Sequence, residues 1–184
     1  MSGRLHIFSG SDNFSIKESV TKFIRKLCGD SPEDNPALEI IRGDSDTEKY
    51  EELLDQLINA VTTPPFLTSD KKRKSRLEYL AGLFKEGIMD GVTVVIDGPG
   101  IDRKRTFYKV CAAVCKENGS LDWFDKIDPK ARDFGASMTR RVQDMCAAAG
   151  KRIAPDAATF LAETSAGDLP RLRNELDKLL AYTE

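Results

Sequence analysis

The sequence predicts an α/β protein, in which a parallel sheet with helices on both faces is followed by a small module of helices alone. Two observations support this. Through about residue 124, short apolar runs alternate with segments whose apolar residues recur at helical spacing, which is the order of right-handed βαβ units. From residue 128 onward only the helical spacing remains. We therefore expect an α/β domain at residues 1–127 and a three-helix domain at residues 128–184.

The first predicted strand and helix enclose a turn that resembles a phosphate-binding P-loop. Residues 4–8 are apolar enough for the centre of a parallel sheet, and apolar residues from Ile16 to Leu27 recur along one helix face. In the pattern G-x-x-x-x-G-K-[ST], backbone N–H groups wrap the phosphates, the lysine reaches the outer phosphates, and the hydroxyl binds magnesium. Counting from Gly10, the last three places hold Ser15, Ile16 and Lys17.

Ile16 therefore replaces the catalytic lysine, and Lys17 lies one residue late, about 100° round the helix. We expect the turn to keep the geometry of a nucleotide site without its chemistry. Asp97 ends an apolar strand, at the place of the metal-binding aspartate of P-loop enzymes, but Gly98–Gly100 follow it without a second acidic residue. The predicted degenerate nucleotide site is thus Gly10, Ser15, Ile16, Lys17 and Asp97, with no catalytic residue.

The other elements follow from the same spacing rules. In the first domain we expect strands at residues 38–41, 92–96 and 121–124 and helices at residues 50–61, 77–84 and 107–115. In the second we expect a helix over residues 138–149 and one that Asp156 caps and that ends near Gly167. A third begins at Asp168, with Pro170 in its first turn.

Pro65, Phe66 and Leu67 lie where two prolines end the predicted helix at residues 50–61. Large apolar residues at such a turn have two interpretations. In one, the aromatic ring packs into the core. In the other, Phe66 and Leu67 are an exposed anchor for a pocket on a partner protein.

Composition and charge exclude several classes of function. The net charge of −2 argues against a protein that holds DNA through a general basic field, although basic clusters occur at residues 71–74 and 103–105. The four cysteines form no C-x-x-C pair, and His6, the only histidine, lies in an apolar strand, so we expect no metal, no cofactor and no histidine-based catalysis. No apolar run is long enough for a membrane span, which favours a cytoplasmic protein.

Five stretches together resemble the delta subunit of the bacterial DNA polymerase III clamp loader. Residues 8–14 match that family's Gly-x-[Asp/Glu]-x-Phe turn, residues 63–67 match its Phe motif, and residues 94–105 match a strand and its following turn. Residues 153–158 and 167–179 resemble the signature of the family's lid domain, with Gly-Asp-Leu, Asn-Glu-Leu and Lys-Leu in register.

This resemblance implies an AAA+-like α/β domain and a helical lid in a subunit of the polymerase holoenzyme that does not hydrolyse ATP. Members of the family bind the ring-shaped sliding clamp, help to open it and assemble with other clamp-loader subunits. DNA is contacted at most indirectly or as part of the complex. The resemblance assigns clamp binding to Phe66 first and Leu67 second, with Pro65 in the place of the family's usual leucine.

Two departures from the family pattern affect these expectations. Family members have a further strand after the Phe motif, whereas Leu67 here runs almost directly into the basic residues 71–74. They also continue into a helical collar domain, so we expect the sequence to be part of a longer chain that builds the loader ring. Two other functions stay open: an active P-loop ATPase that uses Lys17 and Asp97, and an adaptor that binds neither clamp nor nucleotide.

Overall fold

The computed structural model describes residues 3–40 and 76–182. The chain divides into two compact units, Met1–Phe124 and Asp125–Glu184, and each has its own apolar core. The division falls slightly before the expected one after residue 127. The predicted helix at residues 50–61 and the residues Pro65, Phe66 and Leu67 lie outside the described residues.

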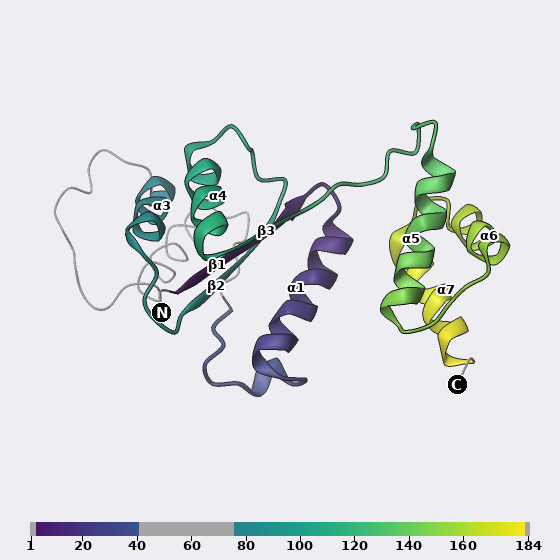
Figure 1. Ribbon diagram of the computed structural model, residues 1–184, viewed down its shortest axis with the longest axis horizontal. Coiled ribbons are helices and arrows are strands. Elements are labelled where there is room, and N and C mark those ends of the chain that lie inside the picture. Colours follow the sequence, from purple (N-terminus) through teal and green to yellow (C-terminus); the bar gives the residue numbers. More distant parts are fainter. Residues whose placement is uncertain (1–2, 41–75, 183–184) are drawn as a thin grey trace. The chain divides into compact units, whose positions relative to one another are not determined.

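Within its described residues, the first unit is built on a parallel sheet of three strands in the order β2-β1-β3 (Figure 1). The central strand β1 (Arg4–Gly10) pairs with β2 (Thr93–Pro99) on one side and with β3 (Gly119–Phe124) on the other. Because all three strands run in the same direction, their carboxyl ends share one edge of the sheet. Ligand sites of open α/β sheets form at this edge.

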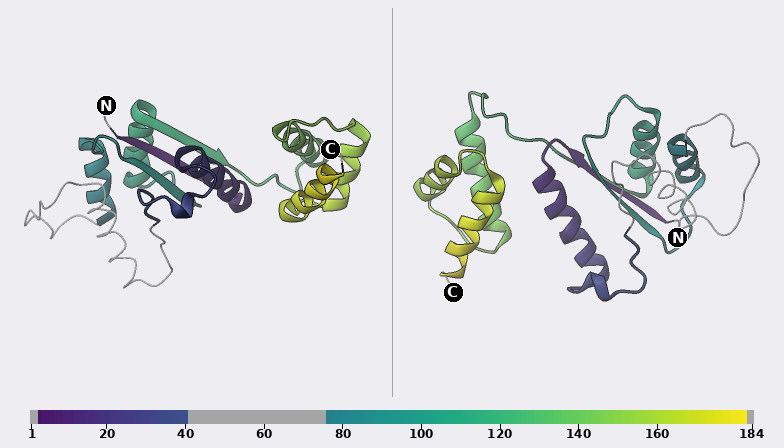
Figure 2. Two further views of the ribbon diagram at one scale, coloured as in Figure 1. Left: turned by 90° about the horizontal axis from the view of Figure 1, so that it is seen from below. Right: turned by 180° about the vertical axis from the view of Figure 1, so that it is seen from behind.

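Helices lie on both faces of the sheet (Figures 1 and 2), as the sequence predicts. Helix α1 (Asn13–Cys28) covers one face, and α3 (Arg76–Glu86) and α4 (Thr106–Asn118) cover the other. On the α1 face, the ring of Phe23 lies 4.5 Å from that of His6 and 5.5 Å from that of Phe8, measured between centroids. The buried core on the opposite face consists of Leu5, Ile7, Leu80, Phe84, Ile88, Val94, Cys111 and Cys115.

The expected strand at residues 38–41 is wrong for the three residues that the structure describes. Residues 38–40 belong to no strand, and Ile40 is 59% exposed. They follow a short 3-10 helix, η1 (Pro32–Asp34), and a turn at Asn35. The N–H groups of Ala37 and Leu38 donate to the side chain and the carbonyl oxygen of Asn35, at 2.9 and 3.0 Å. A local hydrogen bond thus uses the Leu38 N–H, a donor that a sheet ladder could need.

The second unit contains three helices in its described residues: α5 (Phe134–Ala148), α6 (Pro155–Ser165) and α7 (Leu169–Ala181). Asp168 caps α7 as expected, because its carboxylate accepts a hydrogen bond from the Arg171 N–H at 3.0 Å. Asp156 is not the cap of α6, which begins one residue earlier at Pro155, a residue preorganised for the first helical position. The buried core consists of Met138, Val142, Met145, Cys146, Ala158, Ala162, Leu172 and Leu176.

Candidate functional site

The turn between β1 and α1 is shorter than a phosphate-binding loop. Strand β1 ends at Gly10 and α1 begins at Asn13, so only Ser11 and Asp12 separate them. A P-loop needs four residues between its glycines, whose N–H groups surround the phosphates. Here Asn13 and Phe14 are already helical. The structure therefore corrects the expectation that the turn keeps the geometry of a nucleotide site.

Gly10 is required by the packing of the three strand ends. Its φ is +132°, and a Cβ atom there would lie 1.9 Å from the carbonyl oxygen of Phe124 in β3. Its own carbonyl oxygen accepts a hydrogen bond from the Gly100 N–H at 2.9 Å, just beyond β2. The Asp12 N–H donates to the Phe124 carbonyl at 3.0 Å. These bonds close the turn against both neighbouring strands.

Asp12 occupies the place that an anion would take at the start of α1. Its side chain is buried, with 4% of the residue exposed, and its carboxylate accepts hydrogen bonds from the N–H and the hydroxyl of Ser15. Helix N-termini attract phosphates through free N–H groups and the helix dipole. A buried carboxylate that already takes one of these donors offsets the dipole and repels a second negative group.

The other predicted nucleotide-site residues do not converge on this turn. Ile16 is fully buried, so its side chain belongs to the packing between α1 and the sheet. Lys17 is exposed on α1. Asp97 is exposed in β2, where it stands opposite Phe8 in the ladder. Of the five residues, Gly10 and Ser15 lie at the turn, Ile16 is buried in the helix that follows, and Lys17 and Asp97 lie on the surface.

The described residues contain no group of three or more His, Cys, Asp or Glu side chains that could hold a metal ion. Burial raises the pKa of Cys111 to about 12 and that of Cys115 to about 11, so both thiols stay protonated. Burial, and then the charge of Arg4, lower the pKa of His6, whose Nδ1 lies 2.9 Å from the Ser120 hydroxyl. Both cysteines are core residues, and His6 is packed in its strand.

No helix in the described ranges is long and apolar enough to cross a membrane.

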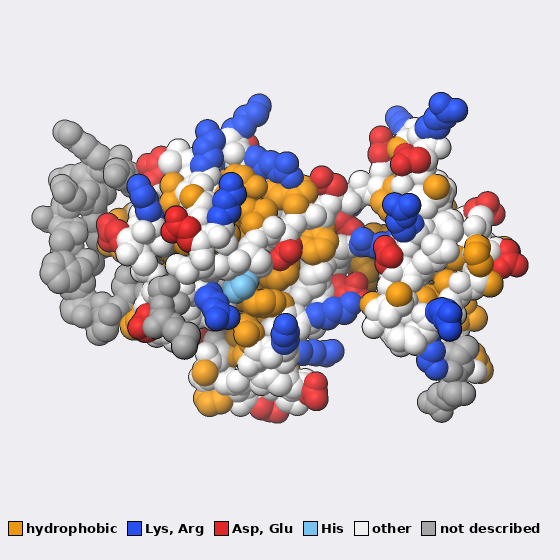
Figure 3. Space-filling model, viewed as in Figure 1, with side chains coloured by type: hydrophobic (Ala, Val, Ile, Leu, Met, Phe, Trp, Pro, Cys, Tyr) orange, Lys and Arg blue, Asp and Glu red, His pale blue; other side chains and the backbone are white. Residues whose placement is uncertain are grey.

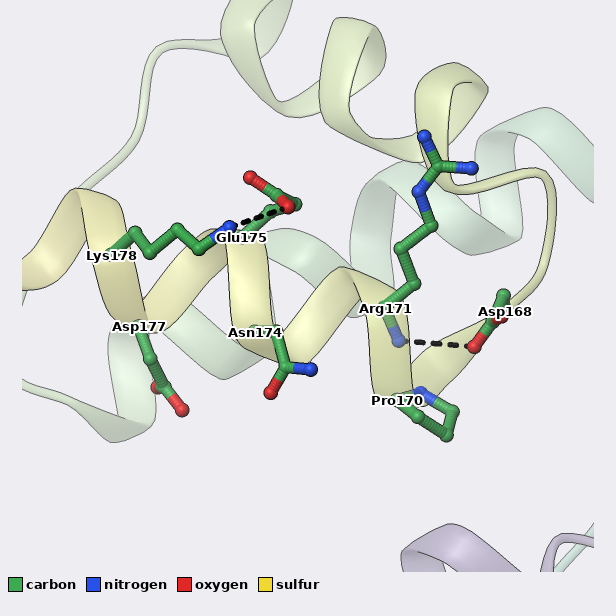
Figure 4. A pocket seen from close by; sticks show the side chains of 7 residues that line it. All are labelled: Asp168, Pro170, Arg171, Asn174, Glu175, Asp177 and Lys178. Atoms are coloured by element: carbon green, nitrogen blue, oxygen red, sulfur yellow. Dashed lines mark hydrogen bonds and ion pairs between the residues drawn. The ribbon is translucent and has the colours of Figure 1, made fainter.

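The exposed side of α7 carries a hollow that is lined by charges of both signs (Figure 4). The Lys178 ammonium pairs with Glu175 at 3.0 Å, and the Asp168 carboxylate is occupied by the Arg171 N–H. One turn away, Arg173 Nε lies 2.9 Å from Asp177 Oδ1, so this arginine is paired as well. The side chain of Arg171 points away from Asp168 (Figure 4). The hollow therefore offers no concentration of one charge for a nucleotide.

Sequence reasoning missed Asp12, which closes the turn. The sequence did contain a sign of this role. Asp is a preferred N-cap residue, and Asp12 stands four residues before Ile16, where the helical periodicity starts. The P-loop pattern drew attention instead to Ser15 and Lys17. The proposed clamp-binding residues Pro65, Phe66 and Leu67 lie outside the described part of the chain, so their arrangement stays a prediction.

Comparison with models of protein families gives no match, and no curated protein matches the sequence. Among solved structures, the chain is similar to the Bacillus subtilis DNA clamp loader delta protein (YqeN), with a TM-score of 0.64 and 16% sequence identity. The match covers 99% of this chain and 53% of that protein, so this chain spans about half the length of the structure that it resembles. The fold of this chain thus resembles that of a clamp loader delta structure.

Proposed function

We propose that this chain is a delta-type clamp-loader subunit, which binds a sliding clamp and helps to open it during DNA replication without hydrolysing ATP. The observation that carries the proposal is the likeness in fold to the DNA clamp loader delta protein, which extends over 99% of the chain. The sequence stretches at residues 63–67 and 167–179 also support it, because they resemble sequence motifs of the delta family.

The closed turn before α1 supports the absence of ATP hydrolysis. A phosphate-binding loop needs free N–H groups, a lysine and room for the phosphates. In this chain Asp12 takes the Ser15 N–H, Ile16 stands in the lysine position, and only two residues join β1 to α1. The subunit would therefore act through protein contacts, within a polymerase holoenzyme whose other subunits supply the hydrolysis.

In the proposed mechanism, Phe66 and Leu67 insert into an apolar pocket on the clamp, with Pro65 in the place of the family's usual leucine. Burial of an aromatic or aliphatic side chain contributes about 1.5–3 kcal/mol. Two such side chains can bias a ring interface that is only marginally closed. The remaining clamp-loader subunits would bind a longer form of this chain, and DNA would be held by the assembled complex.

The test is a titration of the chain with the sliding clamp of the same organism, by isothermal calorimetry. We expect a 1:1 complex that Phe66→Ala weakens at least tenfold, which corresponds to about 1.4 kcal/mol. The matched control is Phe160→Ala, which removes the same side chain from a site on α6 that is 67% exposed. Phe160→Ala should leave the affinity unchanged.

Two results separate the function from the site. Binding that neither substitution weakens would keep the clamp as partner and move the anchor away from Phe66. A folded wild-type chain that does not bind the clamp would contradict the proposed function, and an adaptor role would then be the better explanation.

A further inference from the structure

The junction between α4 and β3 consists of a dipeptide with a chemistry of its own. Asn118 is the last residue of α4 and Gly119 is the first of β3, so the helix passes into the strand without a loop (Figure 1). The sequence contains five asparagines, and only Asn118 precedes a glycine. Because glycine has no Cβ atom, the backbone nitrogen of Gly119 has an unhindered approach to the side-chain amide of Asn118.

Both residues of this junction face water. Asn118 and Gly119 are exposed, and so are Lys116 and Glu117 before them. Figure 3 shows Lys and Arg side chains that stand out from the surface over α4, as on a helix with a solvated outer face. Water therefore reaches the Asn118 amide in the folded chain.

The junction also lies where a helix is least constrained. The last carbonyl groups of a helix lack helical N–H partners, and the last turn frays. Gly119 has already left the helical conformation, with φ of 164° and ψ of −147°. A rotation about the Asn118 backbone is thus enough to bring its side-chain carbon to the Gly119 nitrogen, and no core residue has to move.

We propose that Asn118 is a site of spontaneous deamidation in the folded chain. The backbone nitrogen of Gly119 bonds to Cγ of Asn118 and closes a succinimide ring, and the side-chain nitrogen leaves as ammonia with the proton of the Gly119 N–H. Water then opens the ring. Cleavage between the Gly119 nitrogen and Cγ gives aspartate, whereas cleavage between that nitrogen and the Asn118 carbonyl carbon gives isoaspartate. The net reaction consumes one water and releases one ammonia.

Each product changes the end of α4. Both place a new carboxylate next to Glu117, at the C-terminus of a helix, where the dipole favours positive charge. Lys116 is the one basic residue in that last turn. Isoaspartate also routes the main chain through the former side chain, which inserts an extra carbon atom between helix and strand.

The start of β3 cannot absorb that extra atom. Gly119 pairs with Leu5 of the central strand, and a Cβ atom on it would lie 1.7 Å from the Leu5 carbonyl oxygen. The next residue, Ser120, stands opposite His6 and bonds its Nδ1 at 2.9 Å. Among the described strands, β3 pairs with β1 alone. Isoaspartate therefore shifts or unpairs the first residues of β3 and weakens the first unit.

The experiment incubates the folded chain at neutral and mildly alkaline pH and maps its peptides by chromatography and mass spectrometry. We expect the Asn118 peptide to exchange an amide for a carboxyl group and to separate into aspartate and isoaspartate forms. The rate should rise with pH, because the attacking nitrogen must lose its proton. Asn174 is the internal control, since it is exposed in α7 but precedes Glu175, and its amide should persist.

Two variants separate the effects of charge and of main-chain insertion. Asn118→Gln keeps an uncharged amide whose ring closure is slower, so incubation should leave it unchanged. Freshly prepared Asn118→Asp carries the charge alone. The incubated wild-type chain, enriched in isoaspartate, should unfold at a lower urea concentration than either variant, as measured by the emission of Trp123 in β3.

Three results would overturn this inference. The first is an Asn118 amide that persists in the folded chain for as long as that of Asn174. The second is deamidation in urea but not under native conditions, because the site would then belong to the unfolded chain. The third is an isoaspartate-rich chain as stable as the fresh one, which would contradict the effect on β3. The comparison with Asn174 uses the wild-type chain alone, so it decides the site even if a variant fails to fold.

Discussion

Helices α1 and α4 begin at the same edge of the sheet, after the neighbouring strands β1 and β2, yet their N-termini have opposite electrostatic character. At α1 the buried carboxylate of Asp12 takes the Ser15 N–H. At α4 the capping position is Arg105, no side chain caps the helix, and its first turn holds no acidic residue. Arg103 and Lys104 stand just before it.

The difference shows that two helices at one edge of a sheet can begin with opposite local charge. An α/β sheet offers several helix N-termini at its carboxyl edge, and nucleotide-binding proteins use the first of them. In this chain Asp12 closes the first one, whereas basic residues surround the second. The start of α1 is thus filled by the carboxylate of Asp12, and the basic residues lie before α4.

The largest expected effect comes from an attempt to restore the P-loop lysine. Ile16→Lys would place a charge where the side chain is now fully buried, and we expect a loss of about 4 kcal/mol or more in the free energy of unfolding. Urea unfolding followed by the emission of Trp123, the single tryptophan, measures it. Lys17→Ala, at an exposed position, should stay within about 0.5 kcal/mol. A stable Ile16→Lys variant that binds ATP would show that the turn is open.

Gly10→Ala tests the closed turn itself. The new Cβ would overlap the Phe124 carbonyl, and φ is +132°, so we expect a loss of about 3 kcal/mol in the free energy of unfolding. The matched control is Gly82→Ala in α3, where a Cβ would meet nothing within 4 Å. It should stabilise the same unit by about 0.5–1 kcal/mol. Similar stabilities of the two variants would contradict the close approach of β1 and β3.

The variants Asp12→Ala and Asp168→Ala compare the aspartate caps of α1 and α7. Loss of a cap costs about 0.5–2 kcal/mol, and we expect the upper end for Asp12, because it is buried and also accepts from the Ser15 hydroxyl. Asp168→Ala removes the exposed cap of α7, and its loss in stability should lie at the lower end of this range. Thermal unfolding followed by circular dichroism measures both. Equal costs would mean that the Asp12 carboxylate is not held in the turn.

The smallest expected effect is a pH dependence of the free energy of unfolding, caused by His6 on the sheet face that α1 covers. The pKa of His6 is lowered in the folded chain from its usual 6.5, mainly by burial. Below about pH 6.5 the unfolded chain therefore binds a proton that the folded chain resists, so stability falls as the pH falls. His6→Gln should flatten this slope, which urea midpoints across the range would show. A wild-type chain that becomes more stable on acidification would contradict the lowered pKa of His6.

Periodicity predicted the elements whose apolar residues repeat over several turns or lie in a β-branched run. Helices α3, α4 and α7 and strands β1, β2 and β3 all occur near their expected positions. The expected strand at residues 38–41 failed over residues 38–40, because a short apolar run does not reveal that Asn35 bonds the neighbouring N–H groups. The P-loop pattern likewise identified Ile16 in the lysine position. It did not predict the length of the turn, which depends on the helix start that Asp12 caps.

The most direct test of the account is a calorimetric titration of the chain with its sliding clamp and, separately, with Mg²⁺–ATP. We propose that the start of α1 is closed to phosphates and that the chain acts by binding the clamp. We expect a 1:1 complex with the clamp and no heat of binding from millimolar Mg²⁺–ATP, a concentration at which a working site would be filled. ATP binding together with no clamp binding by the folded chain would contradict the account.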